Sequence, residues 1–264
     1  MKRLTFAALG SALLLASCNQ AQTQPPVTVD PATSGVITFT LKPAAAPQGL
    51  SGQALPTPTN VRVLVSNPTT GFKVIKDVAV GTGSATVEAR VPARDGYKVE
   101  AFSYLIKSQY DKRVLKDGLA GNITVAAGQT TQINMTLQPI VMSIKIPTTV
   151  TAGEKFTATY DQPRSLHPQV YFRLSAKPFI KDEVVDMSLS GGSYKSSFEM
   201  NAPASETNAT MYIQAMRWID ERFVQPGESY TNFLYYAPSV DNGDAPVTAT
   251  LTVPEGGIGI GIGY

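Results

Sequence analysis

Apolar and polar residues alternate along most of the chain from residue 35 onward. The first run places Ile37, Phe39 and Leu41 between threonines, and similar runs recur at 87–91 and 133–137. A period of two is typical of β-strands that bury one face and expose the other. Windows of about 11 residues or more show no convincing helical stripe. The pattern therefore predicts an all-β fold.

A second alternating series follows between residues 142 and 253, after a short segment that contains Pro139. It comprises about seven short strands, a number typical of an immunoglobulin-like sandwich. The sequence therefore predicts two consecutive β-sandwich domains, at 35–138 and 139–254.

Each predicted domain has an apolar face of its own. In the first domain, for example, valines alternate with Arg62 and Leu64 between positions 61 and 65. We therefore expect residues 36–138 and 141–253 to fold separately, each with a cooperative melting transition.

The N-terminus has the layout of a secretory signal. Two basic residues precede an apolar stretch at 4–16, and the only cysteine, Cys18, follows almost directly. A stretch of this length is too short for a transmembrane helix, which needs about 20 residues. The segment Leu15-Ala16-Ser17-Cys18 resembles the lipobox of bacterial lipoproteins, in which the cysteine is acylated and the peptide is cut just before it. An ordinary signal peptide with an incidental cysteine, or a membrane anchor, is the alternative.

This resemblance implies that residues 1–17 are a lipoprotein signal peptide and that Cys18 carries lipid such as palmitate. Such proteins usually carry two or three acyl chains, which attach them stably, whereas one chain binds membranes only marginally. Residues 18–34 then form a disordered tether, because 19–34 contains several prolines and few large apolar residues. Asn19 follows the cysteine, and the sorting rule of some two-membrane bacteria then favours the outer membrane over the inner membrane. The expected location is the cell envelope.

Parts of the first predicted domain resemble a transthyretin-like, or carboxypeptidase-regulatory-like, module. The matching stretches are Val91-Pro92-Ala93, 96–101, 123–131 and Met135-Thr136-Leu137. Arg94-Asp95-Gly96 stands where the family motif has a single glycine. In the second domain, 150–160 and 190–198 resemble bacterial Ig-like modules, without the cysteine pair of antibody domains. These resemblances imply β-sandwiches, and transthyretin-like modules are mostly non-catalytic accessory domains.

The mature chain is expected to carry no net side-chain charge. The full sequence has 22 Lys and Arg residues and 20 Asp and Glu residues, and cleavage before Cys18 removes Lys2 and Arg3. No cluster of basic residues is present, which argues against nucleic acid as a partner. A lipidated Cys18 leaves no thiol for a disulfide, so the core must hold the fold together.

Few residues suggest catalysis or metal binding. His167 is the only histidine, and no nucleophile motif accompanies it, so we interpret it as an incidental loop residue. Zinc would need further His or Cys ligands. Acidic residues at 182–186, 220–221 and 241–244 offer oxygen ligands for calcium, but they lack the spacing of a known calcium loop, which favours solvated turns. The sequence predicts no cofactor, no metal and no enzymatic activity.

Three aromatic residues, Trp218, Tyr235 and Tyr236, are the candidate ligand-binding residues. Exposed Trp and Tyr near arginines and carboxylates suit stacking on sugars or contact with a protein partner. The alternative is that Trp218 packs in the sandwich core. The low-complexity tail at 255–264 alternates Ile with Gly, and it is expected either to be unstructured or to add a strand to a sheet edge.

The leading hypothesis is a lipid-anchored cell-envelope protein that acts as a non-catalytic binding or scaffolding module for another surface protein. The alternative is a carbohydrate or cell-wall binding lipoprotein, which needs Trp218, Tyr235 or Tyr236 exposed on one face. An enzyme would need a cleft that gathers His167 and carboxylates.

Overall fold

The computed structural model describes residues 29–42, 56–80, 85–140, 143–160, 165–166, 170–175, 197–237 and 245–253. Several sequence predictions lie outside these residues, namely those on the signal segment, Cys18, His167, the acidic runs at 182–186 and 241–244, and the tail. The described part is all-β, as the alternating pattern predicts, and its few helical residues form short 3-10 turns.

The first half of the chain forms a sandwich. One sheet has the order β4-β1-β7, and the facing sheet has the order β6-β5-β2-β3. The strands are β1 (Ser34–Lys42), β2 (Asn60–Asn67), β3 (Phe72–Ala79), β4 (Ala85–Pro92), β5 (Arg94–Ile106), β6 (Lys112–Val125) and β7 (Thr130–Thr136), with the 3-10 turn η1 (Pro31–Thr33) before β1. β1 pairs in parallel with β7 and antiparallel with β4.

The second half forms another sandwich. β13, β11 and β9 make one sheet, and β10, β16, β14 and β12 lie in the other. These strands are β9 (Ile144–Lys145), β10 (Thr149–Thr151), β11 (Lys155–Tyr160), β12 (Tyr171–Ser175), β13 (Ser197–Asn201), β14 (Ala209–Trp218) and β16 (Val247–Thr252). Inward side chains such as Phe156, Tyr160 and Phe172 form the core between the two sheets.

One hydrogen-bonded sheet runs through both halves. The connection from β14 to β16 contains η2 (Glu221–Phe223), η3 (Tyr230–Asn232) and β15 (Phe233–Ala237), and we call residues 219–237 the strap. β15 pairs antiparallel with the end of β14 and in parallel with Lys112 and Arg113 of β6. The short strand β8 (Gln138–Pro139) also pairs with β6.

The strap covers the outer face of the first sandwich. Arg62 and Leu64, which alternate with the inward valines of β2, are only 1% exposed each. Leu64, Phe102 and Tyr104 pack with strap residues in the core of the second half. β2 is therefore buried on both faces, whereas its alternating sequence is typical of one buried face.

Buried charges hold the strap in place. The Arg62 guanidinium donates to Asp77 of β3, to Glu228 of the strap and to the Phe223 carbonyl. The Tyr104 hydroxyl donates to the same Asp77 carboxylate at 2.6 Å, and Lys112 lies 3.4 Å from Glu228. The Arg62 charge is thus compensated by carboxylates from both halves, as a buried charge requires.

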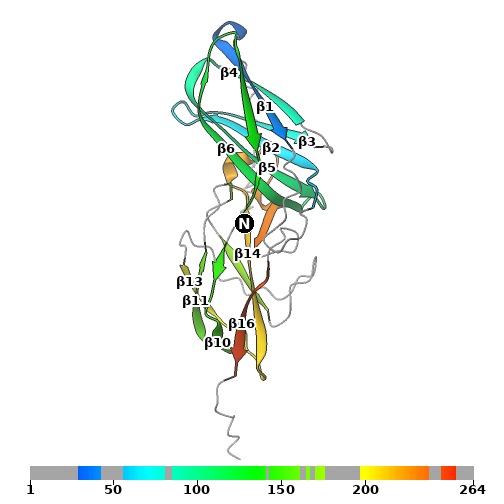
Figure 1. Cartoon of the computed structure of the whole chain (residues 1–264), viewed down its shortest axis with the longest axis vertical. Helices are drawn as coiled ribbons and strands as arrows, with labels where there is room; N and C mark the ends of the chain where they lie inside the picture. The colour runs from blue at the N-terminus through cyan, green and yellow to red at the C-terminus, as the bar shows by residue number, and fades with distance from the viewer. Residues whose placement is uncertain are drawn as a thin grey trace, which may run out of the picture.

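The molecule is elongated (Figure 1). The start of β1 lies at one end of the long axis and β16 lies at the other, with the strap between them (Figure 1). Residues that follow the N-terminal segment therefore enter the fold far from the second sandwich.

Candidate functional site

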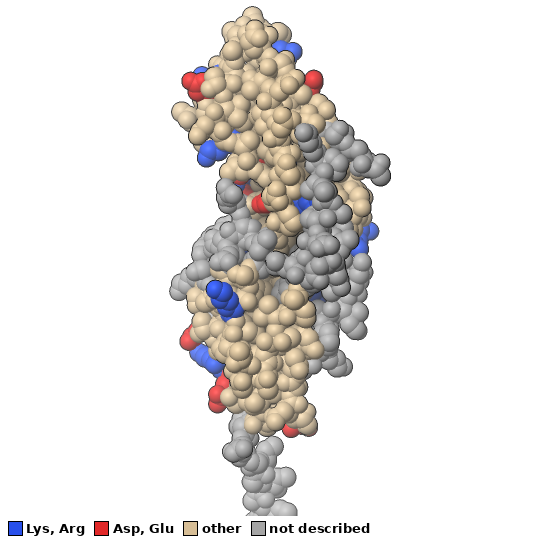
Figure 2. Space-filling view, in the orientation of Figure 1, with Lys and Arg blue, Asp and Glu red and all other residues tan. Residues whose placement is uncertain are grey.

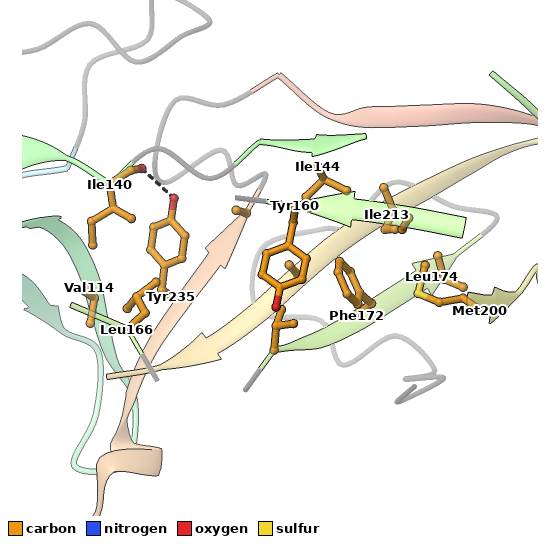
Figure 3. Packing of buried hydrophobic residues seen from close by; sticks show 14 of the residues in the cluster. Val114, Ile140, Ile144, Tyr160, Leu166, Phe172, Leu174, Met200, Ile213 and Tyr235 are labelled. Carbon is orange, nitrogen blue, oxygen red and sulfur yellow. Dashed lines mark hydrogen bonds between the residues drawn. The ribbon is translucent and has the colours of Figure 1, made fainter. Parts of the chain in front are cut away.

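Strand alternation separates the three candidate aromatic residues onto two faces of one sheet. Tyr235 points into the core and is 0% exposed. Its hydroxyl donates to the Ile140 carbonyl at 2.7 Å, close to Val114 and Leu166 (Figure 3). The ring therefore offers no surface to a ligand in this structure, and it packs where both halves of the chain meet.

Trp218 and Tyr236 lie on the opposite, outer face and are half-buried. In the register of β14 and β15, Trp218 is opposite Leu234 and Tyr236 is opposite Met216. The two aromatic residues are thus diagonal neighbours, a placement within reach of long side chains. Trp218 is neither fully exposed nor part of the sandwich core.

Trp218 belongs to a group of edge-to-face rings. Its ring centroid lies 4.7 Å from that of Tyr171 on β12 and 5.7 Å from that of Tyr230 in the strap. Such perpendicular contacts match the positive edge of one ring to the negative face of another. The three rings stabilise one another, and each keeps part of its surface open.

Tyr236 is stacked against arginines. The Arg113 guanidinium lies 4.4 Å from the centre of its ring, and the Arg173 guanidinium lies 5.9 Å away. Arg113 also forms a two-point ion pair with Asp111. We call this outer surface the aromatic–arginine face, and its members are Tyr171, Trp218, Tyr230, Tyr236, Arg113 and Arg173.

Arg217, next to Trp218, does not join this face. Its side chain points inward, is 1% exposed, and lies 5.8 Å from the Tyr160 ring. Burial lowers the pKa of Arg217 to about 10, because removing water disfavours the charged form. Arg217 and Arg222 are near Trp218 in the sequence. Because neighbouring residues of a strand point to opposite faces, Arg217 lies on the core face of the sheet and Trp218 on the outer face.

The structure also contains a cleft that no local motif indicates. It has a volume of about 280 Å³ and lies between the sandwiches. Its lining comes from β5, β6, β7, β8 and the second half, namely Glu100, Asp117, Gly118, Leu119, Thr136, Gln138 and Ser165. These residues are far apart in sequence, so sequence reasoning missed them, and only strand pairing brings them together.

The two carboxylates of this cleft are both engaged. Glu100 accepts hydrogen bonds from Arg222 of the strap at 2.8 and 3.3 Å. Asp117 accepts one from the Ser165 hydroxyl at 2.6 Å. These contacts tie the first sandwich to the second at a further point.

Other features of the described residues suggest no further site. Within those ranges, no group of three or more His, Cys, Asp or Glu residues is placed to hold a metal ion. None of the helices in the same ranges has the length and apolar character needed to cross a membrane. Figure 2 shows acidic and basic side chains scattered over the visible face, without a patch of one sign among the coloured residues.

Comparison with known proteins adds no relative. No known family model and no curated protein sequence matches this chain.

Proposed function

We propose that this chain is a lipid-anchored protein of the cell envelope that acts as a non-catalytic binding or scaffolding module for another surface protein. The likeness of Leu15–Cys18 to a lipobox supports the anchor. The first described residues, η1 and the start of β1, lie at one end of the elongated molecule (Figure 1), and attachment on that side would hold the second sandwich away from the lipid surface.

The aromatic–arginine face carries the binding part of the proposal. Trp, Tyr and Arg are the residue types most enriched among those that dominate binding energy in protein interfaces. All of them except Tyr230, which lies in the 3-10 turn η3, sit on paired strands, so little conformational freedom is lost when a partner binds. The half-buried rings keep accessible surface, and the Arg113–Asp111 ion pair at the edge of Tyr236 adds polar groups for a partner, whereas Arg173 is buried and supports the face from below.

The anchor is tested by replacing the acylated residue. In a bacterial expression host, radiolabelled palmitate enters the wild-type protein and not Cys18→Ser, because a hydroxyl does not replace the thiol in this acyl transfer. Equal labelling of both proteins would end the lipoprotein proposal.

The binding face is tested by capture of envelope proteins from detergent extracts. Arg113→Ala should weaken capture, because it removes a donor and uncovers one side of the Tyr236 ring. Lys155→Ala is the matched control, since this exposed lysine lies on β11, in a different sheet. Equal loss in both variants, or in neither, would contradict a role for this face.

Carbohydrate binding is the second candidate, and the part-exposed ring of Trp218 is the observation that favours it. Tight binding to isolated cell-wall glycan, lost in Trp218→Phe while the melting temperature is kept, would move the proposal to this function. Aromatic rings stack on the apolar faces of sugars, and a smaller ring offers less surface.

The same proposal predicts no turnover on ester, peptide, phosphate or glycan substrates. Glycosidases need two carboxylates roughly 5–10 Å apart, one of them poised to give up a proton. Glu100 and Asp117 share a cleft, but each already accepts hydrogen bonds. Sugar cleavage that disappears in Glu100→Gln or Asp117→Asn would overturn the non-catalytic proposal.

A further inference from the structure

We propose that the cleft between the two sandwiches binds one sugar unit through its hydroxyl groups. This site is separate from the aromatic–arginine face, and it does not depend on a partner protein binding there. It rests on the shape of the cleft, the hydrogen-bonding groups of its lining and one exposed leucine.

The cleft has walls from both halves of the molecule. Glu100 and Leu119 are direct cross-strand partners on β5 and β6, and Asp117 lies two residues from Leu119 on the same face. Thr136 and Gln138 close one side, and Ser165 closes the side of the second sandwich. Ligand sites favour such junctions, and a volume of about 280 Å³ lies near the lower end of their usual range, enough for a single sugar ring.

The two carboxylates of the cleft are held by hydrogen bonds from within the molecule. The Glu100 side chain is 12% exposed and both of its oxygens accept from Arg222. Asp117 accepts from Ser165. These bonds fix the carboxylates in place, and each oxygen retains acceptor capacity for a ligand hydroxyl. A neutral ligand with hydroxyl groups can donate to these oxygens without displacing Arg222 or Ser165.

The remaining polar groups both donate and accept. The Thr136 and Ser165 hydroxyls and the Gln138 amide supply both kinds of group within the same lining. Sugar hydroxyls likewise donate and accept, so paired hydroxyls on one ring match carboxylate and amide groups held side by side. A ligand with acceptors alone could not donate to the carboxylate oxygens.

Leu119 supplies the apolar contact. It is 44% exposed and it lines the cleft. The C–H face of a sugar ring can pack on it while the ring hydroxyls reach the polar wall, and this burial removes the exposed apolar area from water.

The experiment titrates the full chain, in a detergent without sugar headgroups, with methyl glycosides of glucose and N-acetylglucosamine. The leucine methyl groups are labelled with carbon-13 and followed by NMR. We expect millimolar binding, as is usual for a single small polar ligand, with the largest shift at the Leu119 methyl groups. Ethylamine is the cationic probe.

Two variants and one control make the result specific. Gln138→Ala should weaken binding about tenfold by removing one ligand hydrogen bond. Leu119→Arg should abolish binding by filling the cleft. Ile106→Arg is the control, since Ile106 is 45% exposed and lies outside the cleft lining. Three NMR results would each overturn the proposal. They are chemical-shift changes that persist in Leu119→Arg, changes with ethylamine but not with the glycosides, and no change with either glycoside.

The outcome is distinguishable from that of the proposed function. Leu119→Arg leaves the aromatic–arginine face intact, so capture of an envelope protein should persist when sugar binding is lost. Arg113→Ala should weaken capture of the envelope protein and leave sugar binding in the cleft unchanged.

Discussion

The two hydrophobic cores of this molecule differ in which parts of the chain build them. The first core lies between the sheets of the first sandwich, and its buried members all fall between Ile37 and Leu137. The second core extends from Leu64 to Leu251, and it includes Phe102, Tyr104 and Val114 of the first half. The first sandwich closes its core with its own residues, whereas the second uses the outer face of the first.

The comparison teaches that dependence between the halves runs mainly in one direction. The sheet of β2, β5 and β6 has one face in each core. Removing the second half would expose one face of this sheet, while its other face would stay packed in the first core. Removing the first half would take away a wall of the second core, together with the strap's pairing to β6, and would leave the strap paired only with β14 and its neighbours in the second half.

The largest expected effect comes from dividing the chain at this junction. Residues 36–138 should fold and melt cooperatively, although the exposed face of Leu64 and Phe102 should make the fragment prone to association. Residues 141–253 should lose much of their cooperativity, because the strap residues Phe223 and Phe233 lose their contacts with the Phe102 ring. Circular dichroism melting of both fragments measures the difference.

This experiment also decides the earlier expectation that both halves fold alone. Equal, cooperative melting of the two fragments would support independent domains and would contradict the one-directional dependence. An unfolded first fragment would show that the first core is less complete than its residues suggest.

A single substitution at the junction should have the next largest effect. Arg62→Met keeps most of the buried apolar stem but leaves Asp77 and Glu228 facing each other without their shared cation. Breaking a buried ion pair in this way typically costs about 3 kcal/mol. Arg222→Met is the control, because its ion pair with Glu100 is half-exposed and worth about 1 kcal/mol or less. Urea denaturation compares them, and equal losses would contradict the special role of Arg62.

A glycine in the first sandwich provides a matching probe away from the junction. A Cβ on Gly35 would lie 2.4 Å from the Ala126 carbonyl oxygen and 2.8 Å from that of Gln129, both backbone atoms that cannot turn aside. Gly35→Ala should therefore cost about 2 kcal/mol in the unfolding of the first sandwich. Gly121→Ala is the control, since a Cβ there meets nothing within 4 Å. Comparable stability of the two variants would contradict this close approach.

The smallest expected effect is the pH dependence of the junction. Burial by itself raises the pKa of Glu228, but the hydrogen bond and charge of Arg62 outweigh burial and lower the pKa below its ordinary value of 4.5. A lowered folded pKa means that this contribution to stability is complete above pH 4.5 and is lost as the pH falls through the folded value.

Melting temperatures between pH 7 and pH 3 measure this contribution. The wild type should lose more stability over that range than Glu228→Gln, which cannot titrate at this position. The difference between the two curves should appear only below about pH 4.5. A parallel fall of both curves would show that other carboxylates account for the acid sensitivity.

Much of the secondary structure follows from the sequence, because strands that bury one face leave a period of two. The runs at 37–41, 61–65 and 87–91 fall within strands, and the run at 133–137 does so up to Thr136. The candidate aromatic residues were harder to interpret. Tyr235 and Tyr236 are adjacent, so they must point to opposite faces of a strand, but nothing local decides which face is the core.

The cleft and the junction network could not be predicted for a different reason. Arg62 and Glu228 are 166 residues apart, and neither belongs to a local motif. Arg62 alternates with valines and so reads as a residue on the open face of a strand. Its burial follows only from the strap, which brings a carboxylate and two aromatic rings onto that face.

The sequence by itself determined the all-β class and the positions of the main strands, since local alternation and turn residues act over a few positions. Tertiary structure alone decided that the two sandwiches share one sheet, that Arg62 is buried, and that Trp218 and Tyr236 face outward while Tyr235 does not. These outcomes depend on which distant surface covers each strand, and burial by a distant segment leaves no periodic trace in the strand that it covers.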